Sequence, residues 1–286
     1  MSLKFSRLLI LISLILLLGN SPAKSQDFGS DLFSQVRLPN DAAPESIGSY
    51  SKGCLSGGSY VPHSRFYDQL RPSRNRYWGH PNLIKFIEST AKKIYNRYGN
   101  GLLLGDLSMP RGGPMPYGHK SHQNGLDVDI FYEKKPIIEM QRYELESYKP
   151  SSLLSVNQEN INTNIWSDYH YELLKVVAEH SEVSRIFVNP VIKKKLCNIA
   201  EERNDRDWLF KIRPWGGHYN HFHVRLDCPE NSAECINQKP VEKYHACGNE
   251  INYWLNKDKV YESGSTVARK WMLLSNLPKS CNKLLK

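Results

Sequence analysis

The sequence predicts a protein that mixes helices and strands, and three observations support this. Residues 82–98 carry apolar side chains at helical spacing and stop at Gly99, which predicts a helix. Residues 125–132 and 221–226 alternate apolar and polar side chains, as strands do. The 286 residues contain no internal repeat, and their 40% hydrophobic and 23% charged content excludes a disordered or fibrous chain.

Other segments complete the predicted elements. Ser167 is placed to cap a second helix. Residues 186–188 form a short apolar run that predicts a buried strand, and Asn189-Pro190 ends this strand before a third helix over about 191–202. Residues 108–118 hold three prolines and three glycines, which predicts a long loop.

The first 25 residues have the features of a secretory signal peptide. These are two cations, an apolar run and small residues at the cleavage positions: Lys4, Arg7, Leu8–Leu18, Ala23 and Ser25. The apolar run is shorter than the roughly 20 residues that span a bilayer, which favours cleavage before Gln26 over a membrane anchor. We therefore expect an exported mature chain without an anchor. It would form a single domain over 26–286, with a Cys- and Pro-rich extension from about 227.

The charge of the chain argues against nucleic acid as a partner. Loss of Lys4, Arg7 and Lys24 lowers the formal charge from +9 to +6. No dense stripe of cations interleaved with aromatic residues is present, and we expect the short run Lys193–Lys195 to lie on a solvated helix face. A modest positive field suits an anionic extracytoplasmic polymer such as the cell wall.

Export also makes disulfides the expected state of the six cysteines. No paired C-x-x-C motif supports a zinc ribbon. Fifteen pairings are open to six cysteines, and only Cys228 and Cys235 are close enough in sequence to suggest a small local loop.

Two segments concentrate the side chains that carry chemistry. In 118–129, strand alternation places Asp127 and Asp129 on one face, where burial is costly unless the carboxylates are paired or bind a cation. In 215–225, the same alternation gathers polar side chains on one face of the other strand. Five of the ten histidines fall in these two segments: His119, His122, His218, His221 and His223.

The combination of the two segments favours a metal site. A lone H-x-H pair is more often an ordinary surface or core feature, but a catalytic zinc needs three N or O ligands and an open position. His122, Asp129 and His223 supply such a set. A Ser-His-Asp hydrolase is less favoured, because Ser121 stands in no G-x-S-x-G elbow.

At these residues the sequence resembles the penicillin-insensitive murein endopeptidases. The H-x(6)-D and H-x-H core belongs to a wider group of lysostaphin-type, D-Ala-D-Ala-cleaving and hedgehog-like zinc domains. The strings GHxSHQxGLDVDIF and RIFVNP are more specific to the endopeptidases. The similarity extends over most of the mature chain, through Arg111-Gly112-Gly113, 46–49, 77–81, 118–129, 185–190 and 218–225 to the C-terminal cysteines.

The resemblance implies an α+β fold with a small antiparallel sheet flanked by helices and one zinc ion. The implied reaction is hydrolysis of D-alanyl–meso-diaminopimelyl cross-links of peptidoglycan in the periplasm. His122, Asp129 and His223 match the family's metal ligands, and His119 is a further candidate ligand. His221 matches the general base, and His218 matches a further active-site histidine. In its protonated form, we expect His218 to donate to the oxyanion of the tetrahedral intermediate.

The implied substrate carries free carboxylates, and Arg111 and Arg225, which stand near the site segments, are candidates to hold one. A supporting structural role for Arg225 is equally open. Some relatives carry an Asp-x-x-His pair for an accessory metal where this chain has Asn157 and Asn160, so we predict no second metal. The implied disulfides are Cys54–Cys281, Cys197–Cys247 and Cys228–Cys235.

Two alternatives remain open at this stage. One is a D-Ala-D-Ala-type dipeptidase or carboxypeptidase on the same fold. The other is a non-catalytic, zinc-bearing wall-binding domain, which the presence of His218 and His221 disfavours. The sequence leaves the oligomeric state open, a dimer included.

Overall fold

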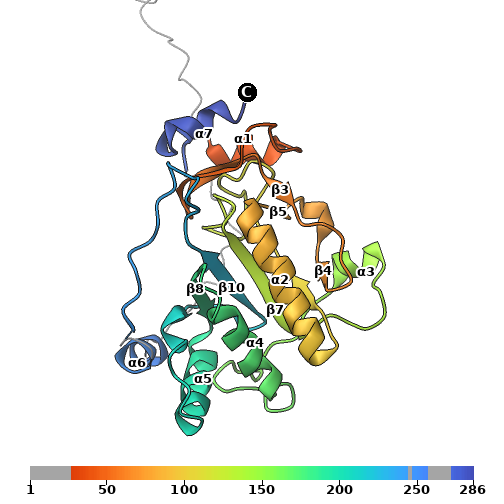
Figure 1. Ribbon diagram of the computed structural model, residues 1–286, viewed down its shortest axis with the longest axis vertical. Coiled ribbons are helices and arrows are strands. Elements are labelled where there is room, and N and C mark those ends of the chain that lie inside the picture. Colours follow the sequence, from red (N-terminus) through yellow and green to blue (C-terminus); the bar gives the residue numbers. More distant parts are fainter. Residues whose placement is uncertain (1–26, 244–246, 257–271) are drawn as a thin grey trace, which may run out of the picture.

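A six-stranded sheet forms the centre of the protein (Figure 1). The computed structural model describes residues 27–243, 247–256 and 272–286, so the expected signal peptide lies outside the described residues. Within these ranges no helix has the length and apolar character needed to cross a membrane. The strands follow in the spatial order β4 (Tyr67–Gln69), β6 (Leu102–Leu104), β7 (Asp127–Lys134), β10 (His221–Leu226), β8 (Val183–Val188) and β9 (Ile212–Pro214).

The expected antiparallel sheet is present, with one addition at each edge. Strands β6, β7, β10 and β8 pair antiparallel, whereas β4 and β9 join the two edges as parallel strands. In the register of the central pair, His223 lies opposite Asp129 and Arg225 opposite Asp127. Paired residues share a face, so the histidines and carboxylates gather on one side of the sheet, as the alternation predicts.

The apolar face of the sheet packs against three helices, which are α2 (Pro81–Tyr98), α4 (Asp168–Ala178) and α5 (Pro190–Glu202) (Figure 1). Each was expected from a local signal. Gly99 ends α2 with a positive φ of 71°, Ser167 is the N-cap of α4, and the Asn189 side chain accepts a hydrogen bond from the Val191 amide at the start of α5. Leu126, Val128, Phe222 and Val224 point into the shared core.

The expectation of a solvated lysine run on α5 is wrong for one residue. Lys194 is exposed, but the Lys193 side chain is fully buried and its Nζ donates to the Leu209 carbonyl at 2.7 Å. The reason is positional, since Ile192 and Leu196 also face the core and Lys193 lies on the same side of the helix.

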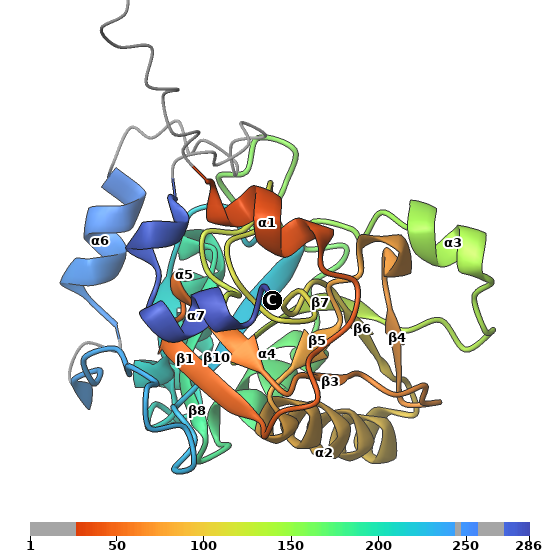
Figure 2. The ribbon, with the colours of Figure 1, turned by 90° about the horizontal axis from the view of Figure 1, so that it is seen from above.

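The two ends of the described chain meet at one end of the molecule. Helices α1 (Gly29–Gln35) and α7 (Lys279–Lys283) lie side by side there, next to the hairpin of β1 (Glu45–Ser49) and β2 (Lys52–Ser56) (Figure 2). The Cys54–Cys281 disulfide joins β2 to α7. A second small core fills this region: Phe33, Ile47, Cys54, Met109, Met115, Leu277, Cys281 and Leu284.

The predicted loop over 108–118 packs on that second core. Met109 and Met115 are buried in it, and Gly112 and Gly113 have positive φ values of 63° and 77°. A side chain at Gly112 would come within 2.0 Å of the Gln123 carbonyl, so only glycine allows this close approach. The loop therefore holds the segment that contains His122 against the N-terminal hairpin.

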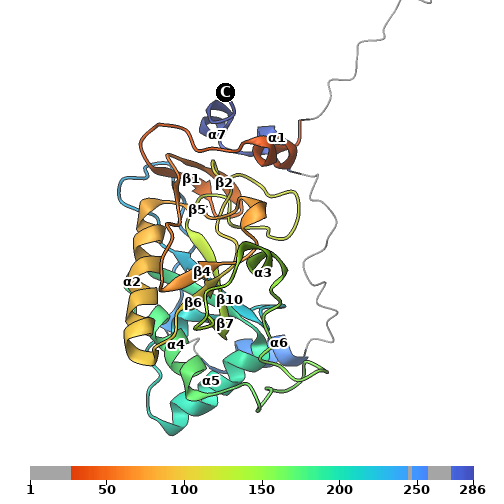
Figure 3. The ribbon, with the colours of Figure 1, turned by 90° about the vertical axis from the view of Figure 1, so that its right-hand side faces the viewer.

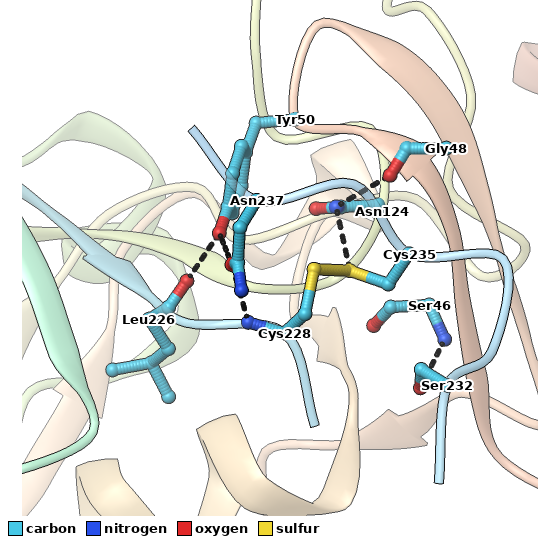
Figure 4. The surroundings of a disulfide bond; sticks show 9 residues. All are labelled: Ser46, Gly48, Tyr50, Asn124, Leu226, Cys228, Ser232, Cys235 and Asn237. Carbon is cyan, nitrogen blue, oxygen red and sulfur yellow. Dashed lines mark hydrogen bonds between the residues drawn. A yellow bond between two sulfur atoms is a disulfide. The ribbon is translucent and has the colours of Figure 1, made fainter. Parts of the chain in front are cut away.

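The C-terminal extension folds back onto the main domain through a short disulfide loop, Cys228–Cys235 (Figure 4). The Ser46 amide donates to Ser232 Oγ, and the Tyr50 hydroxyl donates to the Leu226 carbonyl at 2.7 Å. The remaining disulfide, Cys197–Cys247, ties α5 to the segment before α6 (Asn249–Asn256). All three pairings are those that the resemblance implies. The smaller elements are β3 (Ser59–Tyr60), β5 (Trp78–Gly79) and α3 (Arg142–Ser147).

Candidate metal centre

Polar side chains converge on one face of the sheet, opposite to the face that packs on the core. Helix α2 lies on the core side (Figure 3). Strand β7 supplies Asp127 and Asp129, and β10 supplies His221 and His223. His122 comes from the turn before β7. The structure thus brings together residues from both segments that the sequence singles out.

Three ligand-type atoms form a tight triangle at the centre of this group. His122 Nε2 lies 3.2 Å from His223 Nδ1 and 3.3 Å from Asp129 Oδ1, and His223 Nδ1 lies 3.6 Å from the same oxygen. Ligands held about 2.0–2.1 Å from a tetrahedral zinc ion are separated by roughly 3.3 Å. The triangle therefore matches the donor spacing of a zinc site.

In each of the two imidazole rings, the contact of the outer nitrogen explains why the other nitrogen faces the centre of the triangle. His122 Nδ1 lies 2.8 Å from the Leu107 carbonyl, and His223 Nε2 lies 3.0 Å from Asp127 Oδ1. Both oxygens accept hydrogen bonds and cannot donate, so we assign the ring protons to these outer nitrogens. The two inner nitrogens then present lone pairs to each other. A cation between them would relieve this repulsion.

The electrostatics of the cluster also favour a cation. Asp129 Oδ1 is buried and has no hydrogen-bond partner. Burial lowers the pKa of His122, but Asp129, Asp127 and Asp106 outweigh burial and raise the pKa above its ordinary value. Burial lowers the pKa of His223 to about 4, which keeps this ring neutral, the form that binds metals. The carboxylates of the site therefore favour a positive charge at its centre, while the neutral His223 ring stays available as a ligand.

His119 borders the triangle. One of its ring nitrogens lies within 4.8 Å of the ligand atoms of His122 and Asp129, which makes His119 a candidate member of the metal group. Its Nε2 lies closer to a different carboxylate, 3.0 Å from Asp106 Oδ2 against 3.5 Å from Asp129 Oδ2. This geometry favours His119 as a hydrogen-bond donor to Asp106.

Asp127 and Arg225 form a buried pair beside the triangle. Arg225 donates to both carboxylate oxygens of Asp127, at 2.8 and 3.1 Å, and also to Gln238. Burial raises the pKa of Asp127, but Arg225 and His223 outweigh burial and hold it well below its ordinary value. The ionised Asp127 also accepts from the His122 amide at 2.9 Å. These contacts support the structural role for Arg225 over substrate binding.

His221 and His218 line the same site. His221 Nδ1 lies 2.7 Å from Asn220 Oδ1, and its Nε2 lies 3.8 Å from Asp129 Oδ2. His218 Nδ1 lies 2.8 Å from the Gly216 carbonyl, and the two rings are 5.1 Å apart. Burial lowers the pKa of His221, and burial followed by the neighbouring histidines lowers the pKa of His218 to about 3. Both rings are therefore neutral at rest.

Backbone strain marks two of the site histidines. His122 and His218 have positive φ values of 66° and 52°, which non-glycine residues adopt rarely. The Asp127 carboxylate holds His122 in this conformation by accepting from its amide. Strained residues of this kind concentrate at functional sites.

Other predicted residues lie apart from the cluster. Arg111 donates to the carbonyls of Leu38, Leu284 and Lys286. Its guanidinium therefore holds the two chain ends together, which disfavours a role in substrate binding. Asn157 and Asn160 lie in an exposed turn, where both hydrogen-bond with Ser155.

Two site residues, Asp106 and Asn220, were not singled out by the sequence, and neither were the two arginines beside Asp106. Asp106 lies next to His119 and is neutralised by Arg76 at 2.9 Å and Arg74 at 3.1 Å. Asn220 orients His221 through its side-chain oxygen. The only sequence signal for Asn220 is its place directly before the H-x-H pair. Asp106 and the two arginines stand in no motif.

A cavity of about 250 Å³ elsewhere does not coincide with this cluster. It lies beyond the end of β7 and is lined by residues including Asp68, Tyr95 and Lys135. No convergence of ligand atoms accompanies it among the described residues. The candidate site is therefore marked by the convergence of its ligand atoms and not by the volume of a cavity.

Comparison with known proteins gives a consistent result. A family profile described as "Penicillin-insensitive murein endopeptidase" matches residues 46–286. Relatives with the same description are 38% identical over 273 residues in Pectobacterium atrosepticum (95% of each chain) and 37% over 264 residues in Escherichia coli (92% of this chain and 94% of the relative). A relative from Haemophilus influenzae is 41% identical over 233 residues, which is 79% of this chain and 80% of the relative.

Proposed function

The chain belongs to the penicillin-insensitive murein endopeptidases, and we propose that it is a zinc-dependent member that hydrolyses the peptide cross-links of peptidoglycan. The observation that carries this proposal is the triangle of His122 Nε2, Asp129 Oδ1 and His223 Nδ1. Its spacing, its orphaned carboxylate oxygen and its facing lone pairs support a cation held by these three residues.

The ligand set selects the kind of metal. Two imidazoles and one carboxylate suit zinc, and three protein ligands leave a fourth position open, as in catalytic zinc sites. Cysteine is excluded as a ligand because all six cysteines are in disulfides. At such a site a zinc ion supplies a water of lowered pKa, near 7, and polarises a carbonyl.

His221 is suited to move the proton. Asn220 accepts from its Nδ1, so its Nε2 is unprotonated at rest and points towards Asp129. We assign His221 as the general base that takes a proton from the attacking water and passes it to the leaving amine. Its lowered pKa keeps it ready to accept a proton at neutral pH.

The role of His218 needs refinement relative to the sequence-based expectation. A protonated donor to the oxyanion was expected, but the resting ring is neutral and its Nδ1 faces the Gly216 carbonyl. Negative charge that develops on the substrate raises the pKa of a nearby imidazole. We propose that His218 Nε2 takes up a proton from solvent water as negative charge develops on the tetrahedral intermediate, and that the N–H formed there donates a hydrogen bond to the oxyanion.

The substrate and location follow from the family and from the charge of the chain. We propose the D-alanyl–meso-diaminopimelyl cross-link as the bond that is cut. The free carboxylates of murein suit a mature chain whose formal charge, after loss of Lys4, Arg7 and Lys24, is +6. Because murein lies outside the cytoplasmic membrane, we propose a periplasmic location and a cleaved signal peptide over residues 1–25.

Digestion of purified, cross-linked sacculi tests the proposed function. The zinc-loaded chain from residue 26 onward should convert cross-linked dimeric muropeptides into monomers, and a chelator should stop the conversion. His221→Ala serves as the matched inactive protein. Release of free D-alanine without loss of dimers would overturn the endopeptidase reaction in favour of a carboxypeptidase or dipeptidase.

A further inference from the structure

A row of aromatic rings leads away from the metal centre along the same face of the sheet. The centroids of His223 and Phe187 are 5.3 Å apart, those of Phe187 and Trp215 are 5.8 Å apart, and those of Trp215 and Trp254 are 5.3 Å apart. Tyr253 continues the row at 6.1 Å from Trp254. The row joins the candidate ligand His223 to helix α6.

Strand register places this row on the active-site face. Asp129 pairs with His223, His223 with Phe187, and Phe187 with Arg213, which forms one line across β7, β10, β8 and β9. Arg213 then makes an ion pair with Glu250 of α6 at 2.5 Å. The helix accordingly lies on the side of the sheet away from α2, where Figure 3 shows it.

Two attachments hold α6 at the edge of the site. The Cys197–Cys247 disulfide fixes the segment before the helix to α5, and the Arg213–Glu250 pair fixes its first turn to β9. The helix nevertheless leaves large aromatic surface open to solvent, since Trp215 is 52% and Tyr253 is 56% exposed. Neighbouring exposed aromatic side chains of this kind mark binding surfaces.

We propose that Phe187, Trp215, Tyr253 and Trp254 form an aromatic platform that binds the glycan strand of the substrate. This inference rests on the proposed murein endopeptidase function. A pyranose ring has an apolar C–H face and a rim of hydroxyl groups, so it stacks on an aromatic ring while its hydroxyls remain in water. Trp and Tyr suit such a ligand because they combine a wide apolar face with a polar edge.

The distance from the metal centre agrees with a glycan ligand. Three successive ring-to-ring distances, each shorter than 6 Å between centroids, separate His223 from Trp254. A stem peptide joins the cross-link to the sugar through about four residues, which span roughly 13 Å when extended. A cross-link bound at the metal centre therefore places its sugar over the platform.

The test compares two substrates that share one scissile bond. The first is a cross-linked dimeric muropeptide that retains its disaccharides, and the second is the same peptide dimer after the disaccharides have been removed. For Trp254→Ala, we expect the ratio of kcat/KM on the first substrate to kcat/KM on the second to fall about tenfold, the loss of one stacking contact. Trp254→Phe keeps a ring and should keep most of the ratio.

Tyr143→Ala is the matched control. Tyr143 is 71% exposed on α3, at the opposite edge of the sheet (Figure 1), and its loss should leave the ratio unchanged. An unchanged ratio in Trp254→Ala, or an equal loss on both substrates, would overturn the platform while the endopeptidase function stands. A wild-type protein that cuts neither substrate would overturn the proposed function itself, and the platform with it.

Discussion

His122 and His223 face each other with their inner ring nitrogens 3.2 Å apart, while their outer nitrogens lie beside oxygens that can only accept hydrogen bonds. When both rings are neutral, this arrangement opposes two lone pairs in a buried site. Asp129 adds a buried carboxylate oxygen that has no hydrogen-bond partner. A cation at the centre would relieve the repulsion and balance the carboxylate, and this favours the proposed metal site.

The first prediction separates metal ligands from neighbours. His122→Ala should lose bound zinc and all activity, because it removes one corner of the ligand triangle. His119→Gln should retain nearly one zinc ion per chain, because His119 lies closer to Asp106 than to Asp129. Metal analysis of the purified proteins measures both. A metal-free His119→Gln protein would instead make His119 a ligand.

The second prediction concerns the general base. His221→Ala should keep its zinc but lose activity by a factor of about 10² to 10⁴, the usual contribution of a positioned proton acceptor. Asn220→Ala should retain zinc and lose less activity, because it frees the ring that Asn220 orients. Metal content and kcat measured on the same preparations test this assignment. Full activity in His221→Ala would assign proton transfer to another group.

The sequence predicts the elements well where a local pattern specifies them. Period-2 alternation places Asp129 and His223 on one face, and the register then sets them directly opposite each other. The N-caps Ser167 and Asn189 likewise mark helix starts through local chemistry. Cysteine spacing suggests only the local pair Cys228–Cys235, and the full set of disulfide pairings follows from the family resemblance.

The residues that the sequence did not single out depend on tertiary contacts. Asp106 stands in no motif, and only the folded chain brings it to His119 and Arg76. The left-handed conformations of His122 and His218 leave no mark in the amino-acid pattern. Lys193 resembles a surface lysine because its acceptor, the Leu209 carbonyl, lies sixteen residues further along the chain.

The third prediction tests the carboxylate behind His223. Asp127→Asn preserves shape but removes the charge 3.0 Å from His223 Nε2, and it should weaken zinc binding about 10- to 100-fold. Asp106→Asn is the matched control, since Asp106 is also buried between arginine and histidine but contacts His119. For Asp106→Asn we expect the zinc affinity to change by less than about threefold. Competition with a chelator of known affinity measures the zinc affinity of both variants. Equal losses of affinity would contradict a special role for Asp127 in zinc binding.

The fourth prediction compares two disulfides. Cys54–Cys281 closes a loop of sequence separation 227, whereas Cys228–Cys235 closes one of 7. Loop-closure entropy predicts that replacing both cysteines of the first pair by serine costs about 5 kcal/mol of unfolding free energy, against about 2 kcal/mol for the second. Denaturant titrations of the two double variants test this order. Equal losses would mean that contacts of the short loop, such as the hydrogen bond from the Ser46 amide to Ser232, and not loop length, decide its contribution.

The fifth prediction concerns the pH dependence of stability at Lys193. Burial lowers the pKa of this amine from 10.5 to about 7 in the folded protein. Between these two pH values the unfolded chain binds a proton that the folded chain has released, so the free energy of unfolding rises with pH across this window. Below about pH 7 the folded state carries the full cost of the buried charge, which the size of the shift places at roughly 3–5 kcal/mol.

Lys193→Met removes that titration and leaves the Leu209 carbonyl without its donor, a loss of about 1 kcal/mol. The variant should therefore be more stable than the wild type at pH 7 and lose this advantage as the pH approaches 10. Lys194→Met, at the exposed neighbouring position, should follow the wild-type curve throughout. Urea titrations of the three proteins at several pH values measure the difference. Parallel curves for Lys193→Met and the wild type would show that the Lys193 amine keeps an ordinary pKa in the folded protein.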